Sequence, residues 1–207
     1  MEPLKRLVLE RLMEYYRFLT ERTARMASPT VTSAQIAKAL DIDPTQVRKD
    51  LAAIGLTGMG RVGFDVHEAC YAIRVVLGFD QKHEAVLIGT GHLGGVLLAY
   101  SGFARYGLHI MAAFGGGEEA TGRKVAGHRV RPMKAMKPFV KTHRIRLAIL
   151  APPTEPSERL LRRLVTAGVQ AIWNFTPSQV AGPPGILVRN EQHFSVGLSE
   201  IGYHLKR

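Results

Sequence analysis

The apolar positions near the start of the chain recur at helical spacing. Leu4, Val8, Leu12, Tyr15 and Leu19 follow one another at intervals of three or four residues. This spacing places them on one face of a long helix, because side chains three and four residues apart share a helix face. We expect that face to pack against the rest of a small domain.

Two shorter helices joined by a tight turn are predicted next. Thr32, with Gln35 three residues on, forms a capping-box pattern that opens a helix ending near Leu40. Asp43 is suited to cap the following helix, and Pro44 suits its first position, where a missing N–H costs nothing. The apolar stripe of that second helix consists of Val47, Leu51 and Ile54.

The opposite face of the second short helix is polar and basic. Thr45, Arg48, Lys49 and Ala52 lie roughly opposite the apolar stripe, so hydroxyl, guanidinium and ammonium groups face outward. A helix-turn-helix uses such a face of its second helix to contact bases and phosphates in the DNA major groove. A solvated surface helix is the alternative that this helix alone leaves equally open.

A glycine-rich hairpin is predicted after this helix. Gly55 ends the helix, and residues 56–66 form a glycine-rich stretch with Arg61 exposed at its tip. A wing of this kind can place Arg61 in a DNA minor groove.

The second half of the chain alternates strands and helices. An apolar run at 85–88 precedes Gly89, Gly91 and Gly94, a G-x-G-x-x-G pattern, and an apolar helical stretch through Tyr100. Between a strand and a helix, these glycines allow the backbone to approach a pyrophosphate at the helix N-terminus. Further strands are predicted at 110–114, 146–150 and 169–175, and helices at 67–78 and 156–167. The pattern predicts an α/β domain with a parallel sheet that binds a nucleotide, with a turn that holds no ligand as the alternative.

Composition and charge indicate a globular protein with a polyanionic partner. The formal net charge is +11, but residues 1–80 hold 11 Lys and Arg against 10 Asp and Glu, while the remaining residues hold 17 against 7. The predicted DNA-binding half is therefore nearly neutral, and local clustering has to provide its basic face. No apolar run approaches the ~18 residues of a membrane span, so we expect a cytoplasmic protein without a membrane partner. The lone cysteine, Cys70, is expected to be a small core residue.

Several segments of the chain match one known family in order. They are the run Gln46–Leu51, the glycine-rich turn ending at Phe64, the glycine motif with residues 94–100, the segment Asn174–Pro177 and the terminal residues 198–205. By these segments the chain resembles the Rex family of redox-sensing transcriptional repressors. Its wing departs from the usual Arg-Gly-Val-Gly-Tyr, because Gly60 and Arg61 stand in exchanged order.

The resemblance implies an architecture and a function. A winged-helix DNA-binding domain at 1–79 would precede a Rossmann domain at 80–195 and a C-terminal helix at 196–207, which is swapped between the two subunits of a homodimer. The protein would be a repressor and not an enzyme, with neither a catalytic nor a metal site. Its affinity for a palindromic operator in double-stranded DNA would depend on whether NAD+ or NADH is bound.

The candidate site residues fall into three groups. The DNA-binding group is Thr45, Gln46, Arg48, Lys49 and Arg61. The nucleotide-binding group is Gly89, Gly91, His92, Leu93, Gly94, Gly115, Pro153, Asn174 and Phe175, and the resemblance places the last three near the nicotinamide. The switch group, which the resemblance implies changes partners between the oxidised and reduced states, is Arg17, Tyr100 and His193.

Ribose recognition departs from the family pattern. Phe114 is followed by Gly115, where the family has an Asp that binds the adenosine ribose hydroxyls. Glu118 could substitute for that carboxylate if the glycine loop folds back. Residues 122–146 contain nine Lys and Arg and no Asp or Glu. An absent acid near a group of Lys and Arg side chains favours a ligand with an additional phosphate, such as NADP(H) or another adenosine nucleotide. A solvated basic surface is the alternative interpretation of these residues.

The switch also departs from the family pattern. His193 stands where the family has an Asp, and it cannot act as a permanent anion toward Arg17. The redox linkage is therefore expected to be weakened, lost or made pH-sensitive. In the plainest alternative, His193 is a partly exposed loop residue.

Two other classes of protein use a similar nucleotide fold. An oxidoreductase would need a substrate domain and a catalytic constellation beside the nicotinamide, and the sequence after Asn174 supplies no such domain. A CoA-binding module would fit the basic stretch, but the winged-helix pattern argues against it.

Overall fold

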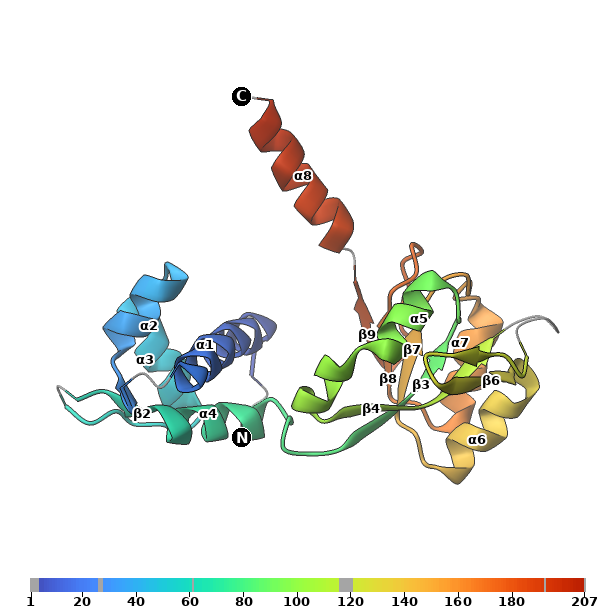
Figure 1. The fold of residues 1–207 in the computed structure, drawn as a ribbon, viewed down its shortest axis with the longest axis horizontal. Coiled ribbons are helices and arrows are strands. Elements are labelled where there is room, and N and C mark those ends of the chain that lie inside the picture. The colour runs from blue at the N-terminus through green and yellow to red at the C-terminus, as the bar shows by residue number, and fades with distance from the viewer. Residues whose placement is uncertain (1–3, 26–27, 61, 116–120, 192, 207) are drawn as a thin grey trace. The chain divides into compact units, whose positions relative to one another are not determined.

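The computed structural model describes residues 4–25, 28–60, 62–115, 121–191 and 193–206. The chain divides into two compact units, Met1–Gln81 and Lys82–Arg207, and each is described by itself (Figure 1). Among the described residues, no helix combines the length and the apolar character needed to cross a membrane.

The first unit is built from helices around a small apolar core. Its elements are α1 (Arg6–Ala24), β1 (Thr30–Val31), α2 (Ser33–Leu40), α3 (Pro44–Ala53), β2 (Phe64–Asp65) and α4 (Val66–Val76). The core contains the buried apolar residues Leu12, Tyr15, Leu19, Ile36, Val47, Leu51, Phe64 and Ile73. The apolar stripes predicted for α1 and α3 are therefore confirmed within the helices, while Leu4 precedes α1 and Ile54 follows α3, and both pack against the core.

Local capping explains where these helices begin. Thr32 and Gln35 form the predicted capping box at α2, with each side chain bonded to the other residue's backbone N–H. The Asp43 carboxylate accepts hydrogen bonds from the backbone N–H groups of Thr45 and Gln46 at the start of α3. A hydrogen bond with the Thr45 side chain, together with these backbone hydrogen bonds, holds the pKa of Asp43 below its usual value.

The wing is shorter than the predicted hairpin. Met59 and Gly63 form an isolated bridge, and β2 pairs with β1 instead of with the other limb of the glycine-rich stretch. Gly63 has φ +96°, and a Cβ there would lie 2.3 Å from the Val31 carbonyl oxygen, so only glycine lets the wing approach β1. Arg61 lies outside the described residues.

The second unit is a parallel sheet with helices on both faces. It contains β3 (His83–Ile88), α5 (His92–Ala99), the 3-10 helix η1 (Ser101–Tyr106), β4 (Leu108–Gly115), β5 (Lys124–Val125), β6 (His128–Pro132), the 3-10 helix η2 (Met133–Ala135), α6 (Met136–Thr142), β7 (Leu147–Leu150), α7 (Glu158–Ala167), β8 (Ala171–Asn174), β9 (Leu187–Asn190) and α8 (His193–Leu205). One apolar cluster packs α6 and α7 on one face, and another packs α5 and η1 on the other.

The strand order identifies the sheet. It runs β5-β6-β4-β3-β7-β8-β9, and every pair is parallel except the β5–β6 hairpin. From β6 to β9 this is the doubly wound order of a Rossmann fold, with the order reversing between β3 and β7. The predicted fold class, a winged-helix domain followed by a Rossmann domain, is confirmed. Ligands of such sheets bind beyond the carboxyl ends of the strands at that reversal.

The structure differs from the prediction in three main respects, besides shifts of one or two residues at the ends of other elements. The helix after the glycine motif ends at Ala99, because Tyr100 adopts an extended backbone and leads into η1. Strand β9 and the elements β5, β6 and α6 were not predicted. Helix α8 begins at His193, so this residue is helical and the expectation of a loop residue is wrong; no Pro or Gly between 193 and 196 interrupts the helix.

Candidate DNA interface and nucleotide site

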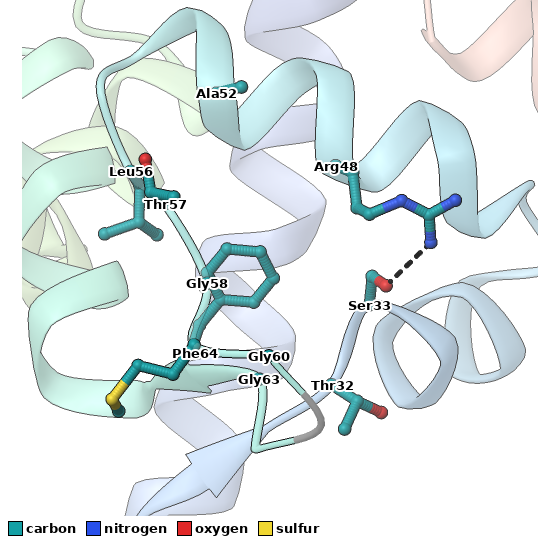
Figure 2. Close-up of a pocket in the computed structure, with 11 residues that line it drawn as sticks. Thr32, Ser33, Arg48, Ala52, Leu56, Thr57, Gly58, Gly60, Gly63 and Phe64 are labelled. Atoms are coloured by element: carbon teal, nitrogen blue, oxygen red, sulfur yellow. Dashed lines mark hydrogen bonds between the residues drawn. The ribbon is translucent and has the colours of Figure 1, made fainter.

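The outward face of α3 carries the predicted basic and hydroxyl groups. The side chains of Thr45, Arg48, Lys49 and Ala52 are exposed. The Arg48 guanidinium donates a hydrogen bond to Thr45 Oγ1 at 3.1 Å. Figure 2 shows its second hydrogen bond, to Ser33 Oγ at 3.2 Å. Two neutral hydroxyls thus hold the guanidinium above the start of α2, and its charge stays available to an anion.

A groove of about 470 Å³ separates α3 from the wing (Figure 2). Arg48 and Ala52 of α3, Thr32 and Ser33 at the start of α2, and the glycine-rich stretch line it. Phe64 and Leu56 form the apolar lining beneath. The groove therefore separates two surfaces that a winged helix uses on DNA, the second helix of the motif and the wing.

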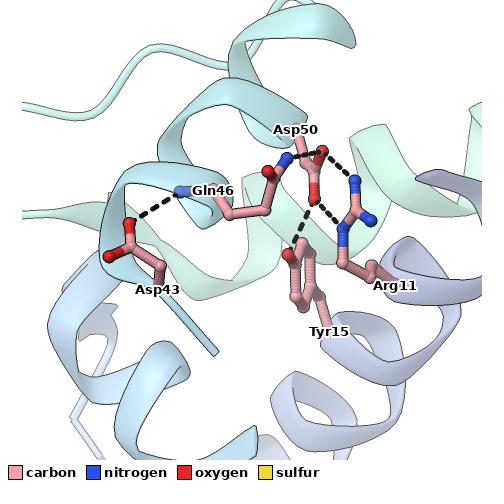
Figure 3. Close-up of polar contacts among 5 residues, drawn as sticks. All are labelled: Arg11, Tyr15, Asp43, Gln46 and Asp50. Atoms are coloured by element: carbon pink, nitrogen blue, oxygen red, sulfur yellow. Dashed lines mark hydrogen bonds and ion pairs between the residues drawn. The ribbon is translucent and has the colours of Figure 1, made fainter. Parts of the chain in front are cut away.

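A buried carboxylate fixes α3 to α1, and the sequence analysis missed it. Asp50 is 3% exposed and accepts two hydrogen bonds from Arg11, at 2.6 and 2.8 Å, one from the Tyr15 hydroxyl at 2.8 Å and one from the Gln46 amide at 2.8 Å (Figure 3). Burial would raise the pKa of Asp50, but the three donor side chains outweigh it and hold that pKa below its usual value. Burial and the bond to Asp50 raise the pKa of Tyr15 well above its usual value.

This network changes the assignment of Gln46. Its side chain is half-buried and donates to Asp50 instead of pointing outward with Arg48 and Lys49. In this structure Gln46 therefore supports the position of α3, and direct contact with DNA by Gln46 stays a prediction.

The glycine motif stands at the reversal point of the sheet. Gly89 directly follows β3 and has φ +102°, and a Cβ there would lie 1.8 Å from the Ala151 carbonyl oxygen after β7. A Cβ on Gly91 would lie 2.8 Å from the Pro152 carbonyl oxygen and 3.0 Å from Pro153 Cδ. A Cβ on Gly94 would lie 2.0 Å from the Gly89 carbonyl oxygen. All three positions accept only glycine, as a tight turn against the neighbouring strand and helix requires.

The same loop presents backbone donors at the start of α5. Gly91 is the N-cap residue and has no side chain to cap the helix, and His92 and Leu93 begin the first turn. The free N–H groups of a helix start favour an anion such as a pyrophosphate. The structure thus brings Gly89, Gly91, His92, Leu93 and Gly94 together with Pro153.

The turn after β8 is held by side-chain amides. The Asn174 amide donates to the Ser178 carbonyl oxygen and to Asn190 Oδ1, both at 2.8 Å, and its own Oδ1 accepts from Thr176. Because this buried amide is fully used within the turn, it shapes the loop. Phe175 packs against Trp173 with ring centroids 4.7 Å apart.

Gly115 is the buried last residue of β4 and pairs with Pro132 at the end of β6. No side chain projects from this position, where the resemblance places a ribose-binding Asp in the family, so the carboxylate is absent as the sequence analysis stated. Glu118, the possible substitute, lies outside the described residues. In the adjacent strand, the Arg131 guanidinium lies 4.6 Å above the centre of the Phe139 ring.

The three predicted switch residues are distributed over both units. The Arg17 side chain on α1 is exposed and contacts Glu14 at 3.3 Å. Tyr100 is 55% exposed, and its ring packs edge-on against Phe103 at 4.9 Å. His193 is the first residue of α8.

Two further kinds of site, a metal site and a reactive thiol, find little support in the described part of the chain. No group of three or more His, Cys, Asp or Glu residues there could hold a metal ion. Cys70 is half-buried, and burial raises the pKa of its thiol to about 11, which makes the reactive thiolate scarce at neutral pH.

Comparisons with known proteins agree with both halves of this description. A sequence profile described as "Putative DNA-binding protein N-terminus" matches residues 6–52, and one described as "CoA binding domain" matches residues 80–178. The "Redox-sensing transcriptional repressor Rex" of Rhodopirellula baltica is 38% identical over 180 residues, which cover 87% of this chain and 76% of that protein.

Solved structures match over almost the whole chain. The crystal structure of RSP in complex with β-NAD+ and operator DNA has a TM-score of 0.90 at 27% identity and covers 99% of this chain and 94% of the other. The structure of RSP in complex with β-NADH has a TM-score of 0.87 at 26% identity, with 99% and 95% covered.

Proposed function

This chain belongs to the Rex family of redox-sensing transcriptional repressors, and from that membership we propose that it binds operator DNA with an affinity set by the NAD+/NADH ratio. The winged-helix unit holds the DNA, and the Rossmann unit holds the dinucleotide. NADP(H) and CoA are not favoured, because RSP, which matches this chain over 99% of its length, was crystallised with β-NAD+ and with β-NADH.

The exposed face of α3 carries the DNA-binding proposal. Arg48 and Lys49 place two positive charges beside the Thr45 hydroxyl, and the groove separates this face from the wing. Arginine and lysine pair with guanine edges and with phosphates, so these side chains supply both positioning and base contacts. Arg61 of the wing is the proposed minor-groove contact, by its place in the sequence.

The glycine loop carries the nucleotide proposal. At each of the three glycines, neighbouring backbone atoms occupy the place that a Cβ would take, and no side chain blocks the N-terminus of α5. Both features fit a pyrophosphate. When it is bound, the nucleotide is either oxidised, as NAD+, or reduced, as NADH, and this difference is what the protein would sense. This chain's residues bind and orient the nucleotide: Gly89 to Gly94 at the pyrophosphate, with Pro153 and Phe175 toward the nicotinamide. Gly115 lies at the adenosine ribose but offers no carboxylate to its hydroxyls.

A homodimer is part of the same proposal. Helix α8 exposes Leu198, Ile201, Tyr203 and Leu205, whose exposed fractions lie between 57% and 81%. Such an apolar surface favours burial against a second copy, and a two-fold dimer would match a palindromic operator. We assign 1–79 to the DNA-binding domain, 80–195 to the nucleotide-binding domain and 196–207, which contains most of α8, to the segment exchanged between subunits.

The proposed role of the nucleotide is regulatory and not catalytic. Arg17 and Tyr100 are exposed and free to exchange partners between two arrangements of the dimer. A ligand shifts such an equilibrium only by its different affinity for the two arrangements. RSP holds operator DNA in its NAD+ complex, which supports NADH as the releasing form.

The test of the DNA-binding proposal is a double variant at α3. Arg48→Ala with Lys49→Ala should abolish binding to an operator duplex in a fluorescence-anisotropy titration, while NADH binding measured by calorimetry stays unchanged. Arg105→Ala, an exposed cation on η1 of the other unit, is the matched control. Retention of operator binding by the double variant contradicts the assignment of α3.

A further inference from the structure

The second unit contains a concentrated set of basic residues that the proposed function does not use. We call this set the basic flank: Arg123, Lys124, Arg129, Arg131, Lys134, Lys137, Lys141, Arg144 and Arg146. No Asp or Glu lies between residues 122 and 146. Most of the chain's net positive charge is therefore on the nucleotide-binding unit, while residues 1–80 are nearly balanced.

The flank extends over consecutive elements, from the outer edge of the sheet to the start of the central strand β7. The β5–β6 hairpin forms the outer edge in the strand order, and η2 and α6 lead from there to the start of β7. All its members are exposed except Lys137, which is partly buried. The flank thus presents its charges to solvent on consecutive elements.

Within the described ranges, no ion pair involves a member of the flank. Several surface cations elsewhere do pair with nearby acids, as in Arg6–Glu10 at 2.8 Å, Lys82–Glu84 at 2.6 Å and Arg162–Glu158. Arg131 lies over the Phe139 ring, but this contact leaves its charge uncompensated. A row of like charges without counter-charges suits a polyanionic partner.

One end of the flank forms a pocket of about 370 Å³. Arg144 and Arg146 line it together with Lys82, His83, Glu84, Leu147, Gln170 and Ala171. The Glu84 carboxylate is already paired with Lys82, so the two guanidinium groups dominate the charge of the pocket. Guanidinium groups bind phosphate oxygens at two points, which a concave site favours.

This pocket is separate from the nucleotide site. It lies at the amino ends of β3, β7 and β8, whereas Gly89 follows the carboxyl end of β3. A strand of six residues spans about 20 Å. The pocket therefore cannot be a part of the pyrophosphate cradle.

We propose that the basic flank binds the phosphate backbone of duplex DNA outside the base pairs contacted by α3 and the wing. The proposal rests on the proposed function, because it adds a second contact surface to a DNA-binding repressor. Phosphate contacts dominate the affinity of proteins for DNA, and the winged-helix unit has little net charge to provide them. Between residues 122 and 146 the one Phe, Tyr or Trp is Phe139, which is buried, so the flank lacks the aromatic stacking platform of a single-strand binder.

The test compares two duplexes. One contains only the operator that the wild-type dimer selects from a random duplex pool, and the other extends it by about one helical turn on each side. Anisotropy titrations over a salt series give the affinity and its salt dependence for both. The variant is Arg144→Glu with Arg146→Glu, the conservative variant is Arg144→Lys with Arg146→Lys, and Arg105→Glu is the control for an unrelated exposed cation.

The variant with Arg144→Glu and Arg146→Glu, called the reversal variant because both charges change sign, should bind the extended duplex more weakly than the wild type does. Its salt slope should be smaller by about one unit for each phosphate that the variant no longer binds. Its affinity for the short duplex and for NADH should stay at the wild-type level, which also shows that it is folded. The control should behave like the wild type. The Lys variant keeps both charges but loses the two-point contacts, so its affinity for the extended duplex should lie between those of the wild type and the reversal variant.

Different results overturn different claims. If the reversal variant matches the control on the extended duplex, or weakens both duplexes equally, the flank does not bind DNA outside the operator. If the reversals reduce binding to tRNA or heparin but not to duplex DNA, the partner is another polyanion and the proposal is wrong. A wild-type protein that selects no duplex contradicts the proposed function itself.

Discussion

The Arg11 guanidinium donates two hydrogen bonds to the Asp50 carboxylate, from Nε to Oδ2 at 2.6 Å and from Nη2 to Oδ1 at 2.8 Å. This pair joins α1 to the helix that carries Arg48 and Lys49. The position of the proposed DNA-binding face therefore depends on a contact between residues 39 positions apart.

Asp50→Asn should destabilise the first unit by about 2 kcal/mol, because Arg11 loses a charged acceptor. The pKa of Asp50 is lowered on folding, so its carboxylate contributes stability above its unfolded pKa of about 3.9 and loses it as the pH falls through the lower folded pKa. Urea unfolding from neutral pH to about pH 3 measures both effects. The variant should show a smaller loss of stability in acid than the wild type, and an equal acid dependence contradicts this role of Asp50.

Gly94→Ala and Gly95→Ala should differ sharply although the residues are adjacent. A Cβ on Gly94 would lie 2.0 Å from the Gly89 carbonyl oxygen, whereas one on Gly95 would lie 3.4 Å from Val125 Cγ1, an ordinary contact. Calorimetric titration should show that the first variant no longer binds NADH and that the second does, with a helix more stable by about 0.5–1 kcal/mol. Equal NADH affinities would show that the tight turn is not needed for the nucleotide.

Gly115→Asp should restore an acceptor for the ribose hydroxyls. Gly115 is not among the glycines with positive φ, so its backbone conformation does not require glycine. A hydrogen bond to a charged group contributes about 1.5–3 kcal/mol, so NADH affinity should rise by about tenfold or more. NADPH should gain nothing, because its 2′-phosphate would meet the new carboxylate. Calorimetry with both nucleotides measures the ratio, and an unchanged ratio contradicts the placement of Gly115 at the ribose.

Most of the framework could be predicted from local patterns. The stripes of α1 and α3, the caps at Thr32 and Asp43 and the glycine motif all depend on residues close together in the sequence, and the structure bears them out. Asp50 was missed because its partners Arg11 and Tyr15 lie on another helix, and nothing local marks an acid within a basic run as buried.

The elements around the basic flank were missed for a related reason. In β6 only Val130 is buried, so the cations on either side hide the alternation of a strand. Strand β9 has no fully buried residue. The role of its Asn190 depends on the neighbouring strand, because its Oδ1 accepts a hydrogen bond from the Asn174 amide on β8. Such cross-strand contacts become visible only when the sheet is assembled.

The most direct test measures the operator affinity of the dimer with saturating NAD+ and with saturating NADH at one salt concentration. The account predicts weaker binding with NADH, by about 5- to 150-fold, the usual range of coupling between two sites. Equal affinity in the two nucleotide states, with both nucleotides shown to be bound, would contradict it.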